Sequence, residues 1–153
     1  MAQILISSIA KLLVYGVISS ISCVFCRLNE ESHDHLFFEC SLTARIWAML
    51  TAKVAIQWQG GNWNDFIMWA AVHLKGKTLA KTISRVLLAA SVYTLWKDRN
   101  ARIFQNSYRD TNSIQNDIFG AVQARLCQLK GFKATQSNRW HQREWDLPDS
   151  IFV

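Results

Sequence analysis

The chain has 153 residues, of which 50% are hydrophobic, and it carries a formal net charge of +6 with a pI of about 9.4. One proline and six glycines argue against a disordered chain and against a sandwich of many short strands, because both are rich in turn residues. The basic balance is compatible with a nucleic-acid partner or an anionic membrane surface. We therefore expect one small domain, or one domain with a short satellite module.

Residues 2–22 (AQILISSIAKLLVYGVISSIS) are mostly apolar or small. A signal peptide would carry positive charge ahead of its apolar stretch, whereas the first cation here, Lys11, lies inside it. A membrane-spanning helix needs about 20 uninterrupted apolar residues, and Lys11, Gly16 and five serines interrupt this segment. We predict an amphipathic core helix over residues 4–15, with a cleaved or membrane-associated segment as the alternative.

The rest of the chain is predicted to be mainly α, a helical bundle of at least four helices. Apolar residues recur in steps of three and four in segments 42–54, 63–75, 78–104 and 112–130. The predicted N-caps are Ser41, Asn62 and either Thr111 or Asn112, whose side chains can accept a backbone N–H. Gly131 is a natural end for the last helix. Residues beyond it are expected to form a polar, loosely held tail, and no sheet is expected beyond a short strand pair beside a metal module.

That metal module is predicted from the spacing of Cys23, Cys26, His35 and Cys40, which is C-x2-C-x8-H-x4-C. Zinc takes four ligands in a tetrahedron, from thiolate sulfur and imidazole nitrogen. A C-x2-C pair can place two sulfurs on one ion through a tight turn, and the next eight residues suffice for the second pair to return. Four protein ligands leave no position for an activated water, so we predict a structural Zn²⁺ in a small zinc-binding module near the N-terminus.

Other interpretations of the cluster are buried cysteines that pack as small hydrophobes and a redox C-x-x-C pair, for which no strand–helix context is present. His33 competes with His35 for the third ligand position. We favour His35 because the apolar residues 36–38 follow it and can anchor it, whereas His33 lies among polar residues. Cys127 is distant in sequence and is predicted to be a free thiol, which fits an intracellular protein of the nucleus or cytoplasm.

The segment CVFCRLNEESHDHLFFECSLTARIW (23–47) resembles the zinc-binding domain downstream of the reverse transcriptase in plant non-LTR (LINE-type) retrotransposons. The positions that match this family are Cys23, Cys26, Glu30, Glu31, His35, Leu36, Phe37, Cys40 and Trp47. A weaker resemblance extends from about residue 8 to 106. It includes a family helix before the first cysteine, whose usual Asp and Arg are missing here, and the later segment LWKDRNARIFQN (95–106).

The resemblance implies a zinc-binding domain of the reverse-transcriptase type over residues 1–106, with its zinc module at 23–40. A C-terminal helix over 107–130 and a basic, aromatic tail over 131–153 would follow. It also implies a retrotransposon-derived fragment, detached from its polymerase. Polymerase catalysis needs closely spaced aspartates that hold two Mg²⁺ ions, and no Asp-Asp pair occurs. A Gly-rich phosphate loop with Lys is also missing, so we expect a non-catalytic domain with no small-molecule substrate.

Two stretches are rich in cations. Residues 75–109 contain eight Lys or Arg and one acidic residue, Asp98, and residues 123–143 contain five cations and no acidic residue. Residues four apart share one face of a helix, basic residues neutralise phosphates, and exposed aromatic rings stack on unpaired bases. The candidate contacts to RNA or DNA are therefore Lys77, Lys81, Arg85, Arg139, Trp140 and Arg143.

Two functions stay open at this point. The chain could be an accessory module that binds RNA or DNA, or a structural or protein-interaction domain stapled by zinc. A solvated helix face is the plainer interpretation of the first basic stretch. In the tail, stacking on bases and packing of the tryptophans onto the bundle are equally compatible. No membrane partner is expected, and the sequence does not determine the oligomeric state. Loss of a zinc ligand is expected to unfold residues 20–50 and to spare most of the helices over 78–130.

Overall fold

The structure is a computed structural model that describes residues 15–16, 21–54 and 61–153. Its helices are the π-helix η1 (His35–Glu39), α2 (Ser41–Thr51), α3 (Trp63–His73), α4 (Leu79–Phe104), α5 (Thr111–Leu126), α6 (Gln136–Glu144) and the 3₁₀-helix η2 (Asp149–Ile151). β-Pairing within these residues is limited to two isolated bridges, Ser22 with Glu30 and Phe132 with Phe152. The mainly α fold is confirmed, whereas the helix expected over 4–15 lies outside the described residues.

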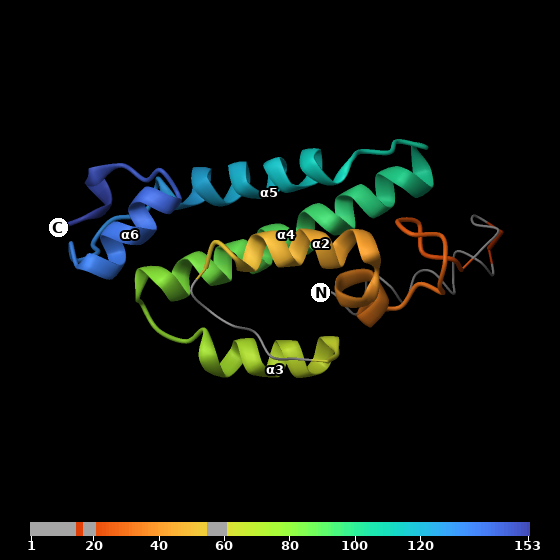
Figure 1. The fold of residues 1–153 in the computed structure, drawn as a ribbon, viewed down its shortest axis with the longest axis horizontal. Coiled ribbons are helices and arrows are strands. Elements are labelled where there is room, and N and C mark those ends of the chain that lie inside the picture. Colours follow the sequence, from red (N-terminus) through yellow and green to blue (C-terminus); the bar gives the residue numbers. More distant parts are fainter. Residues whose placement is uncertain (1–14, 17–20, 55–60) are drawn as a thin grey trace.

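The 26-residue helix α4 is the spine of the bundle, roughly 39 Å long at 1.5 Å per residue. Helix α5 returns along it, α2 packs against α5, and α3 lies on the other side of α4 (Figure 1). Helix α5 buries Ile114, Ile118, Val122 and Leu126, one residue per turn, which joins it to the same apolar core as the cysteine module. None of the helices in the described ranges combines the length and apolar character needed to cross a bilayer.

The helix starts agree with the predicted caps in part. Asn62 accepts from the backbone N–H of Asp65 and so caps α3, as predicted. The predicted caps of the other two helices were wrong by one or two residues. Helix α2 begins at Ser41 with Cys40 as its N-cap, and α5 is capped by Asp110, whose carboxylate accepts from the N–H of Ser113. A carboxylate is as good a cap as a hydroxyl or amide, and the sequence offered several adjacent candidates.

The C-terminal segment corrects the expectation of a loosely held tail. Residues 136–144 form α6, which packs on α4, and Thr135 caps it by accepting from Asn138. Trp145, Leu147 and Ile151 are buried in the main core. They lie after the helix, at spacings that match neither a helix nor a strand, so a search for apolar periodicity does not detect them.

The two tryptophans of this segment provide a test of its packing. Trp145 has 4% of its surface exposed and Trp140 has 38%. We expect Trp145→Ala to lower the free energy of unfolding by about 3–5 kcal/mol, the usual cost of truncating a buried aromatic residue. Trp140→Ala is the matched control and should cost much less. Urea unfolding followed by circular dichroism measures both, and equal, small losses would show that the segment is loosely held after all.

Candidate metal centre

The first ligand pair is set by a tight turn after residue 22. The Ser22–Glu30 bridge brings the two ends of the turn together, and the N–H of Cys23 donates to the carbonyl of Asn29 at 2.8 Å. The N–H of Arg27 donates back to the carbonyl of Cys23 at 2.8 Å, and Arg27 itself takes a left-handed backbone with φ 58°. This turn reverses the chain directly after Cys26, and the N–H of Leu28 donates to Cys26 Sγ at 3.5 Å.

The second ligand pair is set by η1. In a π-helix the backbone N–H of one residue bonds to the carbonyl five residues before it, and here the N–H of Cys40 donates to the carbonyl of His35 at 2.8 Å. The hydroxyl of Ser32 accepts from the N–H of His35 at 3.0 Å and fixes the start of the turn. The wide turn thus joins the two ligands that lie five residues apart.

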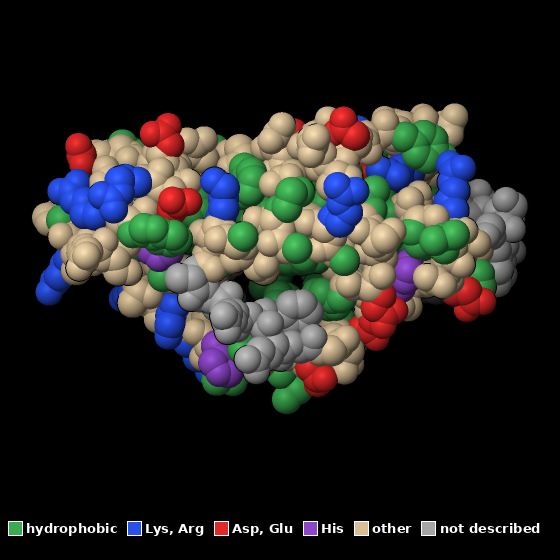
Figure 2. All heavy atoms as spheres, viewed as in Figure 1, with side chains coloured by type: hydrophobic (Ala, Val, Ile, Leu, Met, Phe, Trp, Pro, Cys, Tyr) green, Lys and Arg blue, Asp and Glu red, His purple; other side chains and the backbone are tan. Residues whose placement is uncertain are grey.

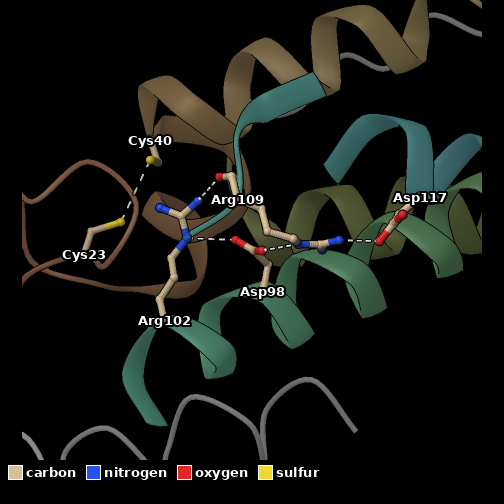
Figure 3. Close-up of polar contacts among 6 residues, drawn as sticks. All are labelled: Cys23, Cys40, Asp98, Arg102, Arg109 and Asp117. Atoms are coloured by element: carbon tan, nitrogen blue, oxygen red, sulfur yellow. Dashed lines mark hydrogen bonds and ion pairs between the residues drawn. The ribbon is translucent and has the colours of Figure 1, made fainter. Parts of the chain in front are cut away.

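The four side chains converge on one point. Their ligand atoms, Sγ of the three cysteines and a ring nitrogen of the histidine, all lie within 4.8 Å of one another. Cys26 Sγ lies 3.2 Å from His35 Nε2, and Cys23 Sγ lies 3.9 Å from Cys40 Sγ (Figure 3). With zinc–sulfur bonds of about 2.3 Å, the sulfurs of a zinc tetrahedron are roughly 3.8 Å apart. The separations therefore fit one zinc ion at the centre of the cluster.

The surroundings of the cluster suit a metal ligated by thiolates. Cys23, His35 and Cys40 are buried, and Cys26 is half-buried. The second ring nitrogen of His35, Nδ1, lies 3.9 Å from a carboxylate oxygen of Glu39. This separation is too long for a hydrogen bond, and Nε2 is the ring nitrogen that lies beside Cys26 Sγ.

The two buried thiols differ in acidity. The hydrogen bond that Cys23 donates, followed by those from the backbone N–H groups of Thr43 and Leu42 at the start of α2, lowers the pKa of Cys40 to about 5. The same shared hydrogen bond, followed by burial, raises the pKa of Cys23 above its usual value. Zinc binds the thiolate form, and the hydrogen bonds that Cys40 accepts, first from Cys23 and then from the start of α2, favour that form.

His33 lies outside this cluster, so the geometry favours His35 as the third ligand. The His33 ring stacks on Trp63, with 6.3 Å between the ring centroids. Next to it, a carboxylate oxygen of Asp34 accepts from the backbone N–H of Trp63 at 2.7 Å. The loop between the two ligand pairs therefore docks the start of α3. Cys127 is exposed after α5 and takes no part in the cluster.

Comparison with known families agrees with this geometry. Residues 4–47 match a family model described as zinc-binding in reverse transcriptase. Searches of curated proteins and of solved structures found no match. The matched segment contains all four residues of the cluster. The family match and the Cys₃His geometry together support a structural Zn²⁺, and the matched family is described by metal binding, not by a reaction.

The zinc module is joined to α4 by a buried ion pair. Arg99 Nε donates to a carboxylate oxygen of Glu31 at 2.9 Å, and both side chains are 2% exposed. Arg99 Nη1 also donates to the amide oxygen of Asn100. A buried charge is tolerated only when it is paired. Arg99 and Glu31 therefore depend on one another, although 68 residues separate them.

A second charged cluster surrounds Asp98, which is fully buried (Figure 3). One of its carboxylate oxygens accepts from Arg102 at 2.8 Å and the other from Arg109 at 2.9 Å. Arg109 also pairs with Asp117. The hydrogen bond to Asp117 raises the pKa of Arg109 most, and the bond to Asp98 raises it as well. The Arg102 guanidinium lies 4.6 Å from the centroid of the Phe25 ring, so this cluster also contacts the zinc module.

These ion pairs correct the sequence-based expectation of a largely unopposed basic stretch. Arg99, Arg102 and Arg109 belong to residues 75–109, where Asp98 is the one acidic residue. Each of the three arginines is paired, and the partner of Arg99 comes from the zinc loop. The sequence signal that could have indicated part of this is the spacing of Asp98 and Arg102, because residues four apart on a helix can form an ion pair.

The predicted contacts to nucleic acid on α4 do not share one helix face. Lys77 precedes the N-cap Thr78, so only Lys81 and Arg85 lie on the helix. Arg85 donates to the carbonyls of Leu74 and Gly76, which end α3, and to the hydroxyl of Thr82. Arg85 is thus engaged in holding the α3–α4 connection. Lys77 is exposed and Lys81 is half-buried.

The predicted contacts in the C-terminal segment also differ in their exposure and in the partners that they already have. Arg139 donates to Asp149 at 2.8 Å, and its guanidinium lies 4.6 Å from the centroid of the Phe152 ring. Trp140 is partly exposed, with its ring edge-on to the buried His141. Burial lowers the pKa of His141, so this ring is held neutral. Arg143 is exposed, and no acidic partner for it occurs within the ranges that the structure describes.

Two histidines only two residues apart provide a sharp test of the zinc ligands. We expect His35→Ala to weaken zinc binding by more than the roughly 10–100-fold that loss of an outer partner costs, because a ligand itself is removed. His33→Ala is the matched control and should bind zinc like the parent chain. Competition against a chromogenic chelator measures both affinities. Equal affinities of the two variants would remove His35 from the site.

The ion pair to α4 gives a second prediction. Glu31→Gln keeps the shape of the side chain but leaves Arg99 buried without a counter-charge, so we expect a loss of about 3–5 kcal/mol in the free energy of unfolding. Glu30→Gln changes an exposed carboxylate next to it and should cost little. Urea unfolding measures the free energy of unfolding of both variants. Similar values for the two would mean that the pair contributes nothing to stability.

Because of the same ion pair, we expect one part of the helices over 78–130 to lose structure without zinc. We expect that chelation exposes backbone amides in the zinc loop and also at the C-terminal end of α4, because Arg99 loses Glu31. Hydrogen exchange before and after chelation locates the change. Protection that stays intact over residues 95–104 would show that α4 holds independently of the zinc loop.

Proposed function

We propose that this chain is a non-catalytic, zinc-stapled helical domain that binds RNA or DNA, and that it derives from the polyprotein of a LINE-type retrotransposon. The resemblance of residues 23–47 and the family match over residues 4–47 support the origin. The observation that carries the binding proposal is the position of α6. This helix packs on α4 and so brings together two basic segments that are far apart in the sequence.

The packing of α5 explains why the two segments meet. Helix α5 runs back along α4, and α6 follows it, so α6 lies beside the start of α4 (Figure 1). We give the name basic end to this part of the molecule, where α6 carries Trp140 and Arg143 and the start of α4 carries Lys81, with Lys77 just before it. Figure 2 shows Lys and Arg side chains gathered at this end of the molecule, together with a few acidic ones. Clustered cations and a partly exposed indole suit phosphates and an unpaired base.

We rank the candidate contacts by their exposure and by the partners that they already have. Lys77 and Arg143 are exposed, and neither has an acidic partner among the described residues. Arg85 and Arg139 already hold the α3–α4 connection and Asp149, respectively. Phosphate contacts are therefore assigned first to Lys77, Lys81 and Arg143, with Trp140 as the stacking residue.

The second candidate function is a protein-interaction domain without nucleic-acid binding. A groove of about 550 Å³ between α3 and α4, lined mostly by apolar side chains, favours it. Exposed apolar surface of this kind often marks a protein interface. The two functions are distinguished by whether the chain binds nucleic acid at low salt.

Charge reversal tests the first proposal. We expect the purified zinc-loaded chain to bind a labelled single strand of RNA or DNA, with an affinity that falls as salt rises. The double variant Lys77→Glu/Arg143→Glu should weaken binding. It should also lower the salt slope by about 0.7 for each phosphate of a single strand that the protein no longer neutralises. Fluorescence anisotropy over a range of salt concentrations gives both quantities.

The matched control is Arg45→Glu/Lys97→Glu, which reverses two exposed cations on α2 and on the later part of α4. It changes the net charge by the same amount and should leave the salt slope nearly unchanged. Equal losses in the two double variants would mean that net charge alone, not the basic end, attracts the nucleic acid. No binding at low salt would favour the protein-interaction domain.

A further inference from the structure

The outer face of α3 carries apolar side chains that the bundle leaves uncovered. Met68 is 69% exposed, Val72 is 64% exposed and Ile67 is 42% exposed. On the other wall of the α3–α4 groove, Tyr93 is 61% exposed. Figure 2 shows hydrophobic side chains at the outer edge of the molecule, where α3 lies. Exposed apolar side chains on one helix face, such as Met68 and Val72, are costly in water and point to a covering partner.

The two ends of α3 carry opposite charges. Asp65 lies in the first turn, and Lys75 follows the C-cap residue Leu74. Both side chains belong to exposed residues. The Asp65 carboxylate accepts from the side-chain amide of Asn62 at 2.7 Å, and neither Asp65 nor Lys75 has an oppositely charged partner in the described part of the chain.

The positions of these residues match an antiparallel pairing of two α3 helices. If a twofold axis passes by Ala70, Met68 of one copy faces Val72 of the other. The same register places Asp65 of each copy opposite Lys75 of the other, because both pairs are centred on residue 70. The apolar and the charged residues thus specify one register, and a twofold axis uses the same surface patch on both subunits.

We propose that two copies of this chain associate through α3, antiparallel about a twofold axis near Ala70. Met68 and Val72 form the apolar centre of the interface. Two Asp65–Lys75 ion pairs, one at each end, fix the direction of pairing. Complementary charges at the edge of an interface contribute to register and specificity more than to affinity.

Sedimentation velocity of the zinc-loaded chain over micromolar to submillimolar concentrations tests this proposal. We expect a dimer. Met68→Lys/Val72→Lys places like charges at the apolar centre and should produce a monomer at all concentrations. The matched control is Phe104→Lys, which changes an exposed apolar residue at the end of α4 and should leave the dimer intact.

Charge exchange tests the register itself. Asp65→Lys alone and Lys75→Asp alone should each raise the dissociation constant of the dimer, roughly tenfold, because each opposes like charges at both ends. The combination of both changes should restore the dimer. A parent chain that stays monomeric at the highest concentration would overturn the proposal, as would a dimer unaffected by Met68→Lys/Val72→Lys. Failure of the combined variant to recover would overturn the antiparallel register.

Discussion

A zinc ion with four ligands orders a loop that has little regular structure of its own. Between Cys23 and Cys40 the chain contains one β-bridge partner and the short η1, too few backbone hydrogen bonds to hold it in place. In a small module of this kind the free energy of metal binding is also free energy of folding. The ordered loop then supplies Asp34 to the start of α3, Glu31 to Arg99 of α4, and Cys40 to the start of α2. These three contacts couple the zinc module to the bundle.

The charges buried beside the zinc module determine how the zinc loop can pack on α4. Burial of Asp98 and Arg99 costs free energy, and only correctly placed partners offset that cost. The partners come from three places: the zinc loop, the next turn of α4, and the connection to α5. An arrangement that displaced any of these segments would leave a charge unpaired. Buried pairs add little net stability, but they make misdocked arrangements unfavourable, so they specify how the zinc loop sits on α4.

The same pairs explain why a basic sequence does not make a uniformly basic surface. Three arginines near the zinc module neutralise carboxylates inside the fold, and Arg85 stabilises carbonyls at the end of α3. The cations that remain available lie mainly around α6 and the start of α4. A polyanion would therefore meet the end of the molecule opposite the zinc module (Figure 1). In this arrangement zinc contributes to binding only through the stability of the fold.

The sequence alone determined the four helices from α2 to α5 and the set of four zinc ligands. Helix periodicity depends on neighbours three and four residues apart, and the metal site lies within eighteen residues, so both signals are local. The choice of His35 over His33 also followed from local sequence, the apolar residues after it. The order of the C-terminal segment depends on Trp145, Leu147 and Ile151, which follow no period. The pairing of Glu31 with Arg99 joins residues 68 positions apart, and the packing of α6 on α4 also joins segments that are distant in the sequence. Only the tertiary structure decided these, because chain packing, and no local preference, brings such residues together.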